Sequence, residues 1–196
     1  MIATIQVLVN SMQMLMVDPS LFTLAYDDHL CSALSLLGCD VTLMGRLLRP
    51  GETFLPSFYT KQRHFYPLSE RLSALPRRLR STLKGFEHLI GMANLNRKAS
   101  ETCPSVIHFQ WLPLPHIDRV FLKILRKRCP LVLTMHDSAP YNNSPVSRLQ
   151  KAGVVQAIDE FDQIIVHTAS SRDRLLDQGV NSERISVVPH GVLNAP

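Results

Sequence analysis

Four short apolar runs of the chain each end in a histidine, and this pattern constrains the fold more than any other feature. The four histidines are His108, His136, His167 and His190. The runs are rich in β-branched residues, and helical spacing precedes three of them, which is typical of parallel strands that alternate with crossover helices. In open α/β sheets, ligands bind outside the carboxyl ends of the strands. The sequence therefore predicts a polar ligand site to which four imidazoles contribute.

The rest of the chain continues this alternation of strands and helices. Its 196 residues are 45% hydrophobic and 19% charged, which suits a globular α/β protein with a substantial core. We predict strands over residues 2–9, 41–44, 106–108, 130–135, 164–167 and 185–188, and helices over residues 20–37, 68–98, 115–128, 147–160 and 170–178. The predicted fold is α/β: a single doubly wound, Rossmann-like domain with a mainly parallel sheet.

Three local features of this prediction can be checked separately. Residues 10–20 are predicted to form a loop, and Ser20 is predicted to cap the helix that follows. Residues 45–66 contain two prolines and several aromatic residues, so we predict an irregular segment, which at that length is usually functional or mobile. Pro76 and Gly85 are two positions at which the helix over residues 68–98 could break.

The cysteines and the hydropathy indicate the compartment. Cys31, Cys39, Cys103 and Cys129 are widely spaced and form no C-x-x-C pair. We interpret them as buried free thiols in a reducing compartment, with disulfides or a zinc site as alternatives. No apolar stretch approaches the roughly 20 residues that a membrane span needs, and residues 1–16 lack the features of a secretory signal. We therefore expect a cytoplasmic protein.

Positive charge is concentrated in the middle of the chain. The net charge is +5, and the segment from residue 61 to residue 98 carries nine basic residues against two acidic ones. Such a patch favours phosphate-bearing partners, either the anionic lipids of an inner membrane face or a polyprenyl phosphate. A solvated helix face is the alternative. Nucleic acid is not expected, because no recognised binding motif accompanies the charge.

Several common catalytic signatures are missing from the sequence. A dinucleotide site would need G-x-G-x-x-G after the first strand, but residues 10–18 contain no glycine. There is no Walker loop, no G-x-S-x-G nucleophile turn and no H-E-x-x-H zinc motif either. Hydride transfer, P-loop hydrolysis and α/β-hydrolase chemistry are therefore not expected.

The residues that follow the predicted strands are the candidate site. His136 and Asp137 are adjacent, so on an extended segment one side chain faces the cleft while the other anchors the loop. His136 could donate a hydrogen bond or position a hydroxyl group, or it could be a structural histidine. His108, Gln110 and Trp111 could line a sugar pocket, although Trp111 could equally be a packing residue.

His167 precedes a helix start that is rich in hydroxyl groups. Thr168, Ser170 and Ser171 would suit a phosphate or a sugar hydroxyl at a helix N-terminus, but Thr168 or Ser170 could simply be an N-cap. A histidine cluster that binds zinc is a further alternative, and it would require distances of about 2 Å and tetrahedral placement.

Four segments in this order and spacing resemble one known family. They are V-I-H-F-Q-W at residues 106–111, P-L-V-L-T-M-H-D at 130–137, I-V-H-T at 165–168 with S-R at 171–172, and I-S-V-V-P-H-G-V at 185–192. They are similar to the N-terminal domain of family-four glycosyltransferases, which have the GT-B fold. The resemblance covers essentially the whole chain and is strongest from residue 106 onward.

The resemblance implies a fold, a reaction and roles for individual residues. Members of this family have two Rossmann-like domains, of which the N-terminal one mainly holds the acceptor and the C-terminal one holds the nucleotide-sugar donor. Transfer retains the anomeric configuration and needs neither metal nor cofactor. His136 matches the family's active-site histidine, and residues 189–191 match the turn into the second domain. The residues expected to bind substrate are His108, Gln110, Trp111, Asp137, His167, Ser171 and His190.

Two departures from the family shape the expectation. The glycine-rich loop that follows the first strand in many members has no counterpart here, and the chain ends where the nucleotide-sugar domain, with its pair of glutamates, would begin. We therefore expect residues 1–196 to be the acceptor-binding half of a hexosyltransferase of polysaccharide biosynthesis. It would be inactive without a second domain or partner chain, and peripheral at the inner membrane face. The alternatives are a non-catalytic binding or scaffold module and a metal-dependent enzyme that uses the histidines.

Overall fold

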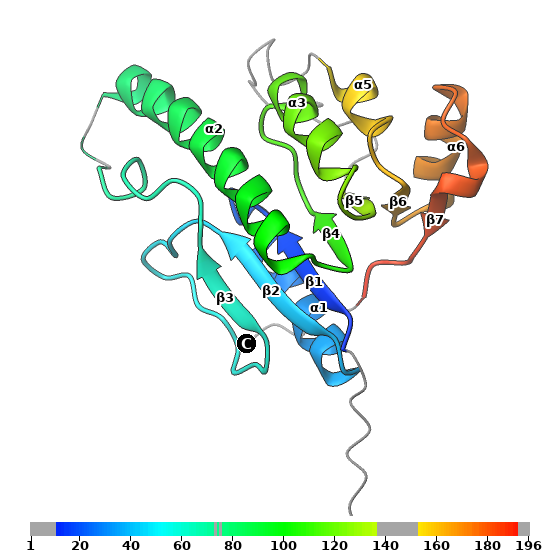
Figure 1. The fold of residues 1–196 in the computed structure, drawn as a ribbon, viewed down its shortest axis with the longest axis horizontal. Helices are drawn as coiled ribbons and strands as arrows, with labels where there is room; N and C mark the ends of the chain where they lie inside the picture. Colours follow the sequence, from blue (N-terminus) through cyan, green and yellow to red (C-terminus); the bar gives the residue numbers. More distant parts are fainter. Residues whose placement is uncertain (1–10, 73, 75, 137–152, 192–196) are drawn as a thin grey trace, which may run out of the picture.

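Parallel strands in the order β3-β2-β1-β4-β5-β6-β7 form one sheet, and every neighbouring pair is parallel. The structure is a computed structural model that describes residues 11–72, 74, 76–136 and 153–191 (Figure 1). Its strands are β1 (Gln13–Val17), β2 (Asp40–Gly45), β3 (Thr60–Arg63), β4 (Val106–Phe109), β5 (Leu131–Met135), β6 (Gln163–Val166) and β7 (Ile185–Val187). The strand order reverses between β1 and β4, and in doubly wound sheets this is where ligands bind.

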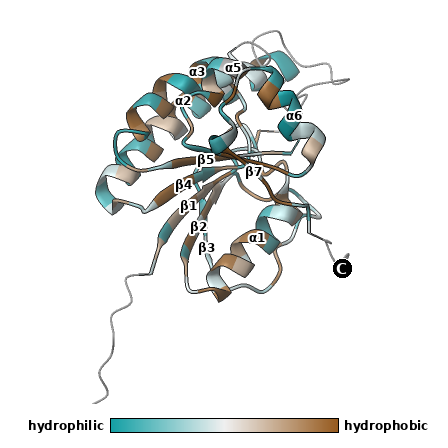
Figure 2. Cartoon of the chain, turned by 90° about the vertical axis from the view of Figure 1, so that its right-hand side faces the viewer, coloured by the Kyte–Doolittle hydropathy of each residue, from teal (hydrophilic) through white to brown (hydrophobic). Residues whose placement is uncertain are grey.

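Helices cover both faces of the sheet. They are α1 (Leu24–Leu36), α2 (Arg77–Thr102), α3 (Pro115–Leu125), α5 (Val154–Ile158) and α6 (Ala169–Asp177), with a short 3₁₀ helix, η1, at Ser182–Arg184. Helix α1 lies on one face, and α2, α3 and α5 lie on the other (Figure 2). Each face has its own core, exemplified by Cys31 with Leu43 on the α1 side and Leu95 with Leu122 on the other. The predicted doubly wound α/β fold is confirmed.

The start of the chain departs from the prediction. The strand predicted over residues 2–9 lies outside the described residues, and the loop predicted over residues 10–20 is wrong for Gln13–Val17, which forms β1. This strand runs between β2 and β4, and Met16 and Val17 are completely buried. Tertiary pairing therefore decides its conformation, because methionine and leucine carry little intrinsic preference for strands.

The predicted cap of the first helix is also wrong. Helix α1 begins at Leu24 with Thr23 as its N-cap residue, not at Ser20. The Asp18 carboxylate accepts hydrogen bonds from the backbone N–H of Ser20 at 3.0 Å and of Thr23 at 3.2 Å. Asp18, which directly follows β1, therefore organises the turn in which we predicted Ser20 to cap the helix.

Between β2 and β4, the structure differs from the prediction in the segment predicted to be irregular and in the bounds of the long helix. The segment predicted as irregular contains β3, an edge strand of polar sequence that pairs with β2. The long helix begins after Pro76, continues through Gly85 and ends at Thr102, where Cys103 adopts a left-handed φ of 47°. Proline has no N–H to donate and is well tolerated at a helix start.

Among the described residues, the other helices and strands begin and end within a few residues of the predicted positions. The helix predicted over residues 147–160 is observed as α5 at Val154–Ile158, and its residues 147–152 lie outside the described residues. All four cysteines are free thiols, as predicted, although Cys39 is only partly buried and Cys103 is exposed. Within the described parts of the chain, no helix is long and apolar enough to cross a membrane.

Candidate functional site

Three of the four predicted histidines meet at the carboxyl edge of the sheet. His136 follows β5, His167 follows β6 and His190 comes soon after β7. The ring centroids of His136 and His167 are 5.1 Å apart, and those of His167 and His190 are 5.0 Å apart. Because the carboxyl ends of parallel strands share one edge, residues far apart in sequence form one cluster.

Tyr26 completes this cluster and was not predicted from the sequence. It belongs to α1, and its ring lies 4.7 Å from His136, 5.3 Å from His167 and 4.9 Å from His190, centroid to centroid. A tyrosine near the start of a predicted helix carries no local signal of function. Its place depends on how the turn after β1 directs α1 across the sheet edge. We call Tyr26, His136, His167 and His190 the rim cluster.

Hydrogen bonds outside the rim cluster determine which ring nitrogens carry protons. His136 donates from Nε2 to Oε1 of Gln110 at 3.0 Å, and His167 donates from Nδ1 to the carbonyl of Val188 at 2.9 Å. The remaining nitrogens, Nδ1 of His136 and Nε2 of His167, face each other at 3.3 Å. A neutral imidazole has one donor and one acceptor nitrogen. When both rings are neutral, these two lone pairs therefore face each other within hydrogen-bond distance, and a proton shared between the rings or a donor hydroxyl beside them would relieve the repulsion.

Electrostatics keep His136 neutral. Burial, and after it the charges of the neighbouring His167 and His190, together lower the pKa of His136 to about 4. His190 also donates from Nδ1, to the carbonyl of Gly191 at 2.9 Å. Near pH 7 His136 is therefore better suited to accept a hydrogen bond from a hydroxyl group than to hold a negative charge.

His108 and Gln110 lie behind the rim cluster. His108 is 5% exposed, and its Nε2 accepts from the Thr134 hydroxyl at 2.7 Å. Burial lowers its pKa to about 4. Gln110 is completely buried and donates from its amide nitrogen to the Met16 sulfur at 2.9 Å, which turns its oxygen toward His136. Gln110 therefore positions His136, and the Gln110 amide nitrogen lies 3.4 Å from Nε2 of His108 behind it.

The structure places the other predicted site residues away from this cluster or in local roles. Trp111 stacks on Phe22 with ring centroids 5.0 Å apart. Thr168 is the N-cap of α6 and accepts from the backbone N–H of Ser171 at 3.1 Å, and the Ser171 hydroxyl is 2.8 Å from the Thr168 hydroxyl. Asp137 lies outside the described residues.

A cavity of about 530 Å³ opens beside the rim cluster. Tyr26, His190 and Glu52 are among the residues that line it. Glu52 is held by Arg46 through two hydrogen bonds of 2.6 and 2.7 Å. The hydrogen bond from Arg46 is the main cause that lowers the pKa of Glu52, to about 2. The space beside the histidines is therefore bordered by a fixed carboxylate that can accept further hydrogen bonds.

The histidines are also the group of described residues that could hold a metal ion. One ring nitrogen from each of His136, His167 and His190 lies within 4.8 Å of the others. A tetrahedral zinc ion with bonds of about 2.05 Å would need these nitrogens about 3.3 Å apart. Nδ1 of His136 and Nε2 of His167, 3.3 Å apart, already have this spacing, so the geometry permits a zinc ion as an alternative to a hydroxyl-bearing ligand.

The parallel sheet and its polar carboxyl edge have the architecture of one half of a GT-B fold. The chain belongs to glycosyltransferase family 4, because the model of that family matches residues 26–193. The matched range includes every residue of the rim cluster. The resemblance seen in the sequence is thereby confirmed. No curated protein matches the chain.

Solved structures share the fold at low sequence identity. The lipopolysaccharide outer core galactosyltransferase WaaB, in its apo form, is 16% identical with a TM-score of 0.51, and the match covers 92% of this chain and 45% of WaaB. HepE of Anabaena, in complex with UDP-glucose, is 16% identical with a TM-score of 0.55, over 92% of this chain and 44% of HepE. The UDP-GlcNAc 2-epimerase of Neisseria meningitidis, bound to UDP-GlcNAc, is 10% identical with a TM-score of 0.55, over 90% and 45%.

These matches establish the fold, and they show how the length of this chain compares with that of the matched structures. The chain spans a little under half the length of each of these structures. A transferase and an epimerase both occur among them, so the fold alone does not choose between these reactions. The choice depends on the family match and on the chemistry of the rim cluster.

Proposed function

We propose that this domain holds the acceptor in a retaining glycosyltransferase that moves a hexose from a nucleotide sugar to a glycan or a lipid-linked acceptor. The single observation that carries the proposal is the rim cluster of a family-4 domain, in which Nδ1 of His136 and Nε2 of His167 come within 3.3 Å of each other at one site. Sugar hydroxyls are donors of the kind that such nitrogens bind. His136 would lie beside the reacting centre, with Gln110 fixing its orientation.

The donor would bind to a second Rossmann-like domain or to a partner chain. Relatives of known structure are about twice as long as this chain. Val187 and Val188, beside the rim cluster, are 40% and 45% exposed. An apolar surface next to a polar site favours coverage by another domain. We expect residues 1–196 alone to bind the acceptor and to transfer little or no sugar.

The exposed side chains of helix α2 favour binding of this domain to a membrane surface. Its residues Leu79, Phe86 and Ile90 are each at least 60% exposed and follow helical spacing, so they share one side of the helix. Arginines at positions 77, 78 and 80 are exposed at its start. Exposed apolar and basic side chains together suit an anionic membrane face. We propose peripheral association there, on the cytoplasmic side.

Calorimetry and saturation-transfer NMR with a panel of mono- and oligosaccharides test the acceptor assignment. We expect the wild-type protein to bind one class of glycan. The substitution His136→Ala should weaken that binding about tenfold or more, because it removes a hydrogen bond inside a half-buried site. The matched control is His116→Ala, since His116 is an exposed histidine on α3. It should bind as the wild type does.

Two results would contradict the proposal. The first is a preference of this chain for nucleotide sugars such as UDP-glucose over every glycan, which would make it the donor side. The second is equal glycan binding by the wild type and by His136→Ala. If the domain binds glycan as expected but no transfer occurs with any nucleotide sugar in the complete protein, it is a binding module that has lost the reaction.

A further inference from the structure

A second cavity, of about 630 Å³, lies where the segments after β2 and β3 meet the start of α2. It is distinct from the rim cluster and shares no lining residue with the cavity beside it. Its lining residues are Arg49, Pro50, Ser69, Glu70, Arg77, Arg80, Ser81 and Lys84. Four of these are cationic and one is anionic. The cavity therefore has a positive electrostatic potential that attracts anions.

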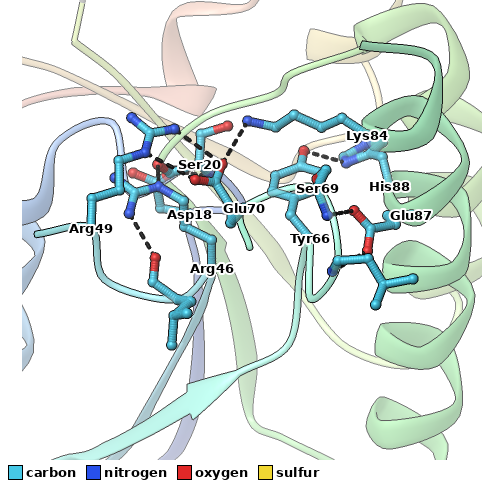
Figure 3. A network of polar contacts seen from close by, with 12 residues as sticks. Asp18, Ser20, Arg46, Arg49, Tyr66, Ser69, Glu70, Lys84, Glu87 and His88 are labelled. Atoms are coloured by element: carbon cyan, nitrogen blue, oxygen red, sulfur yellow. Dashed lines mark hydrogen bonds and ion pairs between the residues drawn. The ribbon is translucent and has the colours of Figure 1, made fainter. Parts of the chain in front are cut away.

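The one carboxylate of the cavity is already shared between two cations. Arg49 donates to Glu70 at 2.9 and 3.0 Å, and Lys84 approaches the same carboxylate at 3.3 Å (Figure 3). Arg77 and Arg80 have no ion-pair partner among the residues that the structure describes. Two guanidinium groups therefore remain at the cavity without a counter-charge.

The start of α2 makes this excess of positive charge more pronounced. The first N–H groups of a helix have no partner within the helix, and they give its N-terminus a partial positive charge. At α2 the N-cap residue is Pro76, which makes no capping hydrogen bond from its side chain, and the first turn has no acidic residue. Arginines at a helix start interact unfavourably with this partial charge, and a bound anion would offset the repulsion.

Ser69 provides an independent sign of a ligand. Its residue is 3% exposed, and its hydroxyl has no hydrogen-bond partner in the described structure. The backbone N–H of Ser69 donates to Glu87 at 2.9 Å, so the residue is held in place while its hydroxyl stays unpaired (Figure 3). A buried polar group without a partner costs free energy. A ligand oxygen in the cavity that Ser69 lines would supply the missing acceptor.

We propose that this cavity binds a phosphate group carried by the acceptor substrate. A phosphate dianion has enough oxygens to accept simultaneously from Arg77, Arg80, the Ser69 hydroxyl and the free N–H groups at the start of α2. The assignment to the acceptor rests on the proposed function, whereas the assignment of phosphate rests on the cavity itself.

Contacts at the sheet edge connect this cavity with the rim cluster. Arg49 lines the phosphate cavity, and its backbone N–H donates to Glu52 at 2.8 Å. Glu52 in turn lines the cavity that contains Tyr26 and His190. The two cavities are therefore neighbours, and an acceptor that carries both a sugar and a phosphate would span them. The predicted substrate class is a glycosyl phosphate or a lipid-linked one.

Calorimetric titration with inorganic phosphate and with glucose 1-phosphate, at constant ionic strength, tests the site. We expect one binding site in the wild-type protein. Arg77→Ala and Arg80→Ala should each weaken phosphate binding about tenfold, as expected for a lost charge-assisted hydrogen bond. Arg78→Ala is the matched control, because Arg78 lies in the same turn but does not line the cavity. It should change the affinity by less than about twofold.

Ser69→Ala separates a ligand contact from a structural role. Removal of an unpaired buried hydroxyl should leave the melting temperature without phosphate unchanged or higher, while phosphate binding weakens about fivefold. A lower melting temperature together with unchanged phosphate affinity would mean that Ser69 is structural and would overturn its assignment as a ligand contact.

The remaining outcomes distinguish this proposal from its competitors. Equal losses in Arg78→Ala and Arg80→Ala, or binding only to phosphatidylglycerol vesicles and not to soluble phosphate, would indicate a diffuse basic surface and overturn the site. Tighter binding of UDP than of pyrophosphate would place a nucleotide there instead. His136→Ala should leave phosphate affinity intact, so phosphate binding without glycan binding would refute only the acceptor role. Glycan binding without phosphate binding would refute only the phosphate site.

Discussion

Among single residues, the buried carboxyl groups behind the site are the most unusual feature. Asp18 and Asp27 are completely buried next to each other. Burial raises the pKa of Asp27 well above its usual value, and the charge of Asp18 raises it further. Asp27 therefore keeps its proton and shares it with Asp18. Because Asp18 binds the N–H groups of the turn after β1, a side-chain carboxylate occupies donors that a glycine-rich loop would offer to a ligand.

The substitution Asp27→Asn should stabilise the protein at neutral pH, by on the order of 1 kcal/mol. In the wild type the folded state retains a proton that the unfolded state releases above about pH 4, so stability falls as the pH rises from that point. Asparagine donates a similar hydrogen bond without this dependence. Urea unfolding at a series of pH values measures the difference, which should be near zero below about pH 4 and should grow with pH.

Asp173→Asn provides the control for this pH series. Asp173 is exposed on α6, so its replacement should change stability little at any pH. If Asp27→Asn instead destabilises the protein at pH 7, both carboxyl groups must be ionised in the native state, and the shared proton is ruled out.

At the scale of elements, helix α2 contains two glycines with opposite surroundings. A Cβ atom at Gly85 would meet no other atom within 4 Å, whereas a Cβ atom at Gly91 would collide with the ring of Phe65. Gly85→Ala should therefore raise the free energy of unfolding by about 0.5 to 1 kcal/mol through helix propensity. Gly91→Ala should lower it by about 1 to 3 kcal/mol through overpacking.

Thermal or urea unfolding of the two variants compares the effects within one helix. Each variant serves as the control for the other, because both make the same chemical change in the middle of α2. A stabilising effect of Gly91→Ala would mean that Phe65 does not pack against the helix at that turn. A destabilising effect of Gly85→Ala would mean that the helix needs flexibility there.

The elements also show where sequence patterns are sufficient. The strands from β4 to β7 were predicted nearly residue by residue, because each is a short run rich in apolar residues, with a turn or helix signal on either side. Strand β3 was missed, because Thr60–Arg63 is polar and becomes a strand only through its pairing with β2. Strand β1 was predicted to be part of a loop, because Gln13–Val17 carries a weaker β-branched pattern than residues 2–9, which lie outside the described residues.

The candidate site could be predicted where it depends on the positions of the strand ends, but not where it depends on packing between distant segments. Four histidines at four strand ends predicted a shared edge, and three of them are in contact there. Neither Tyr26 nor the pairing of Gln110 with His136 was predictable as a contact, because both depend on how distant segments pack. The only sequence feature that indicated the phosphate cavity was the density of basic residues between positions 61 and 98. Its unpaired hydroxyl at Ser69 is visible only in three dimensions.

For the whole molecule, the remaining question is whether the histidines at the sheet edge bind a hydroxyl-rich substrate or a metal ion. Each of the three has one nitrogen bonded to an oxygen of the protein, an arrangement that would also support a metal ligand. The packing of the Tyr26 ring against all three imidazoles favours a hydroxyl-rich substrate. The nitrogen spacing does not separate the two possibilities, because Nδ1 of His136 and Nε2 of His167 are 3.3 Å apart, as two zinc ligands would be.

Treatment with EDTA should therefore leave both the melting temperature and glycan binding unchanged. A structural or catalytic zinc ion would contribute several kcal/mol to folding or binding, so its removal would lower the melting temperature by many degrees. Metal analysis of the protein before and after treatment provides the control, and addition of zinc should compete with glycan if it occupies the same nitrogens. Stoichiometric zinc whose removal abolishes glycan binding would make the rim cluster a metal centre. In that case the hydroxyl-binding role of His136 would have to be abandoned, while the phosphate cavity, which contains none of these histidines, would be unaffected.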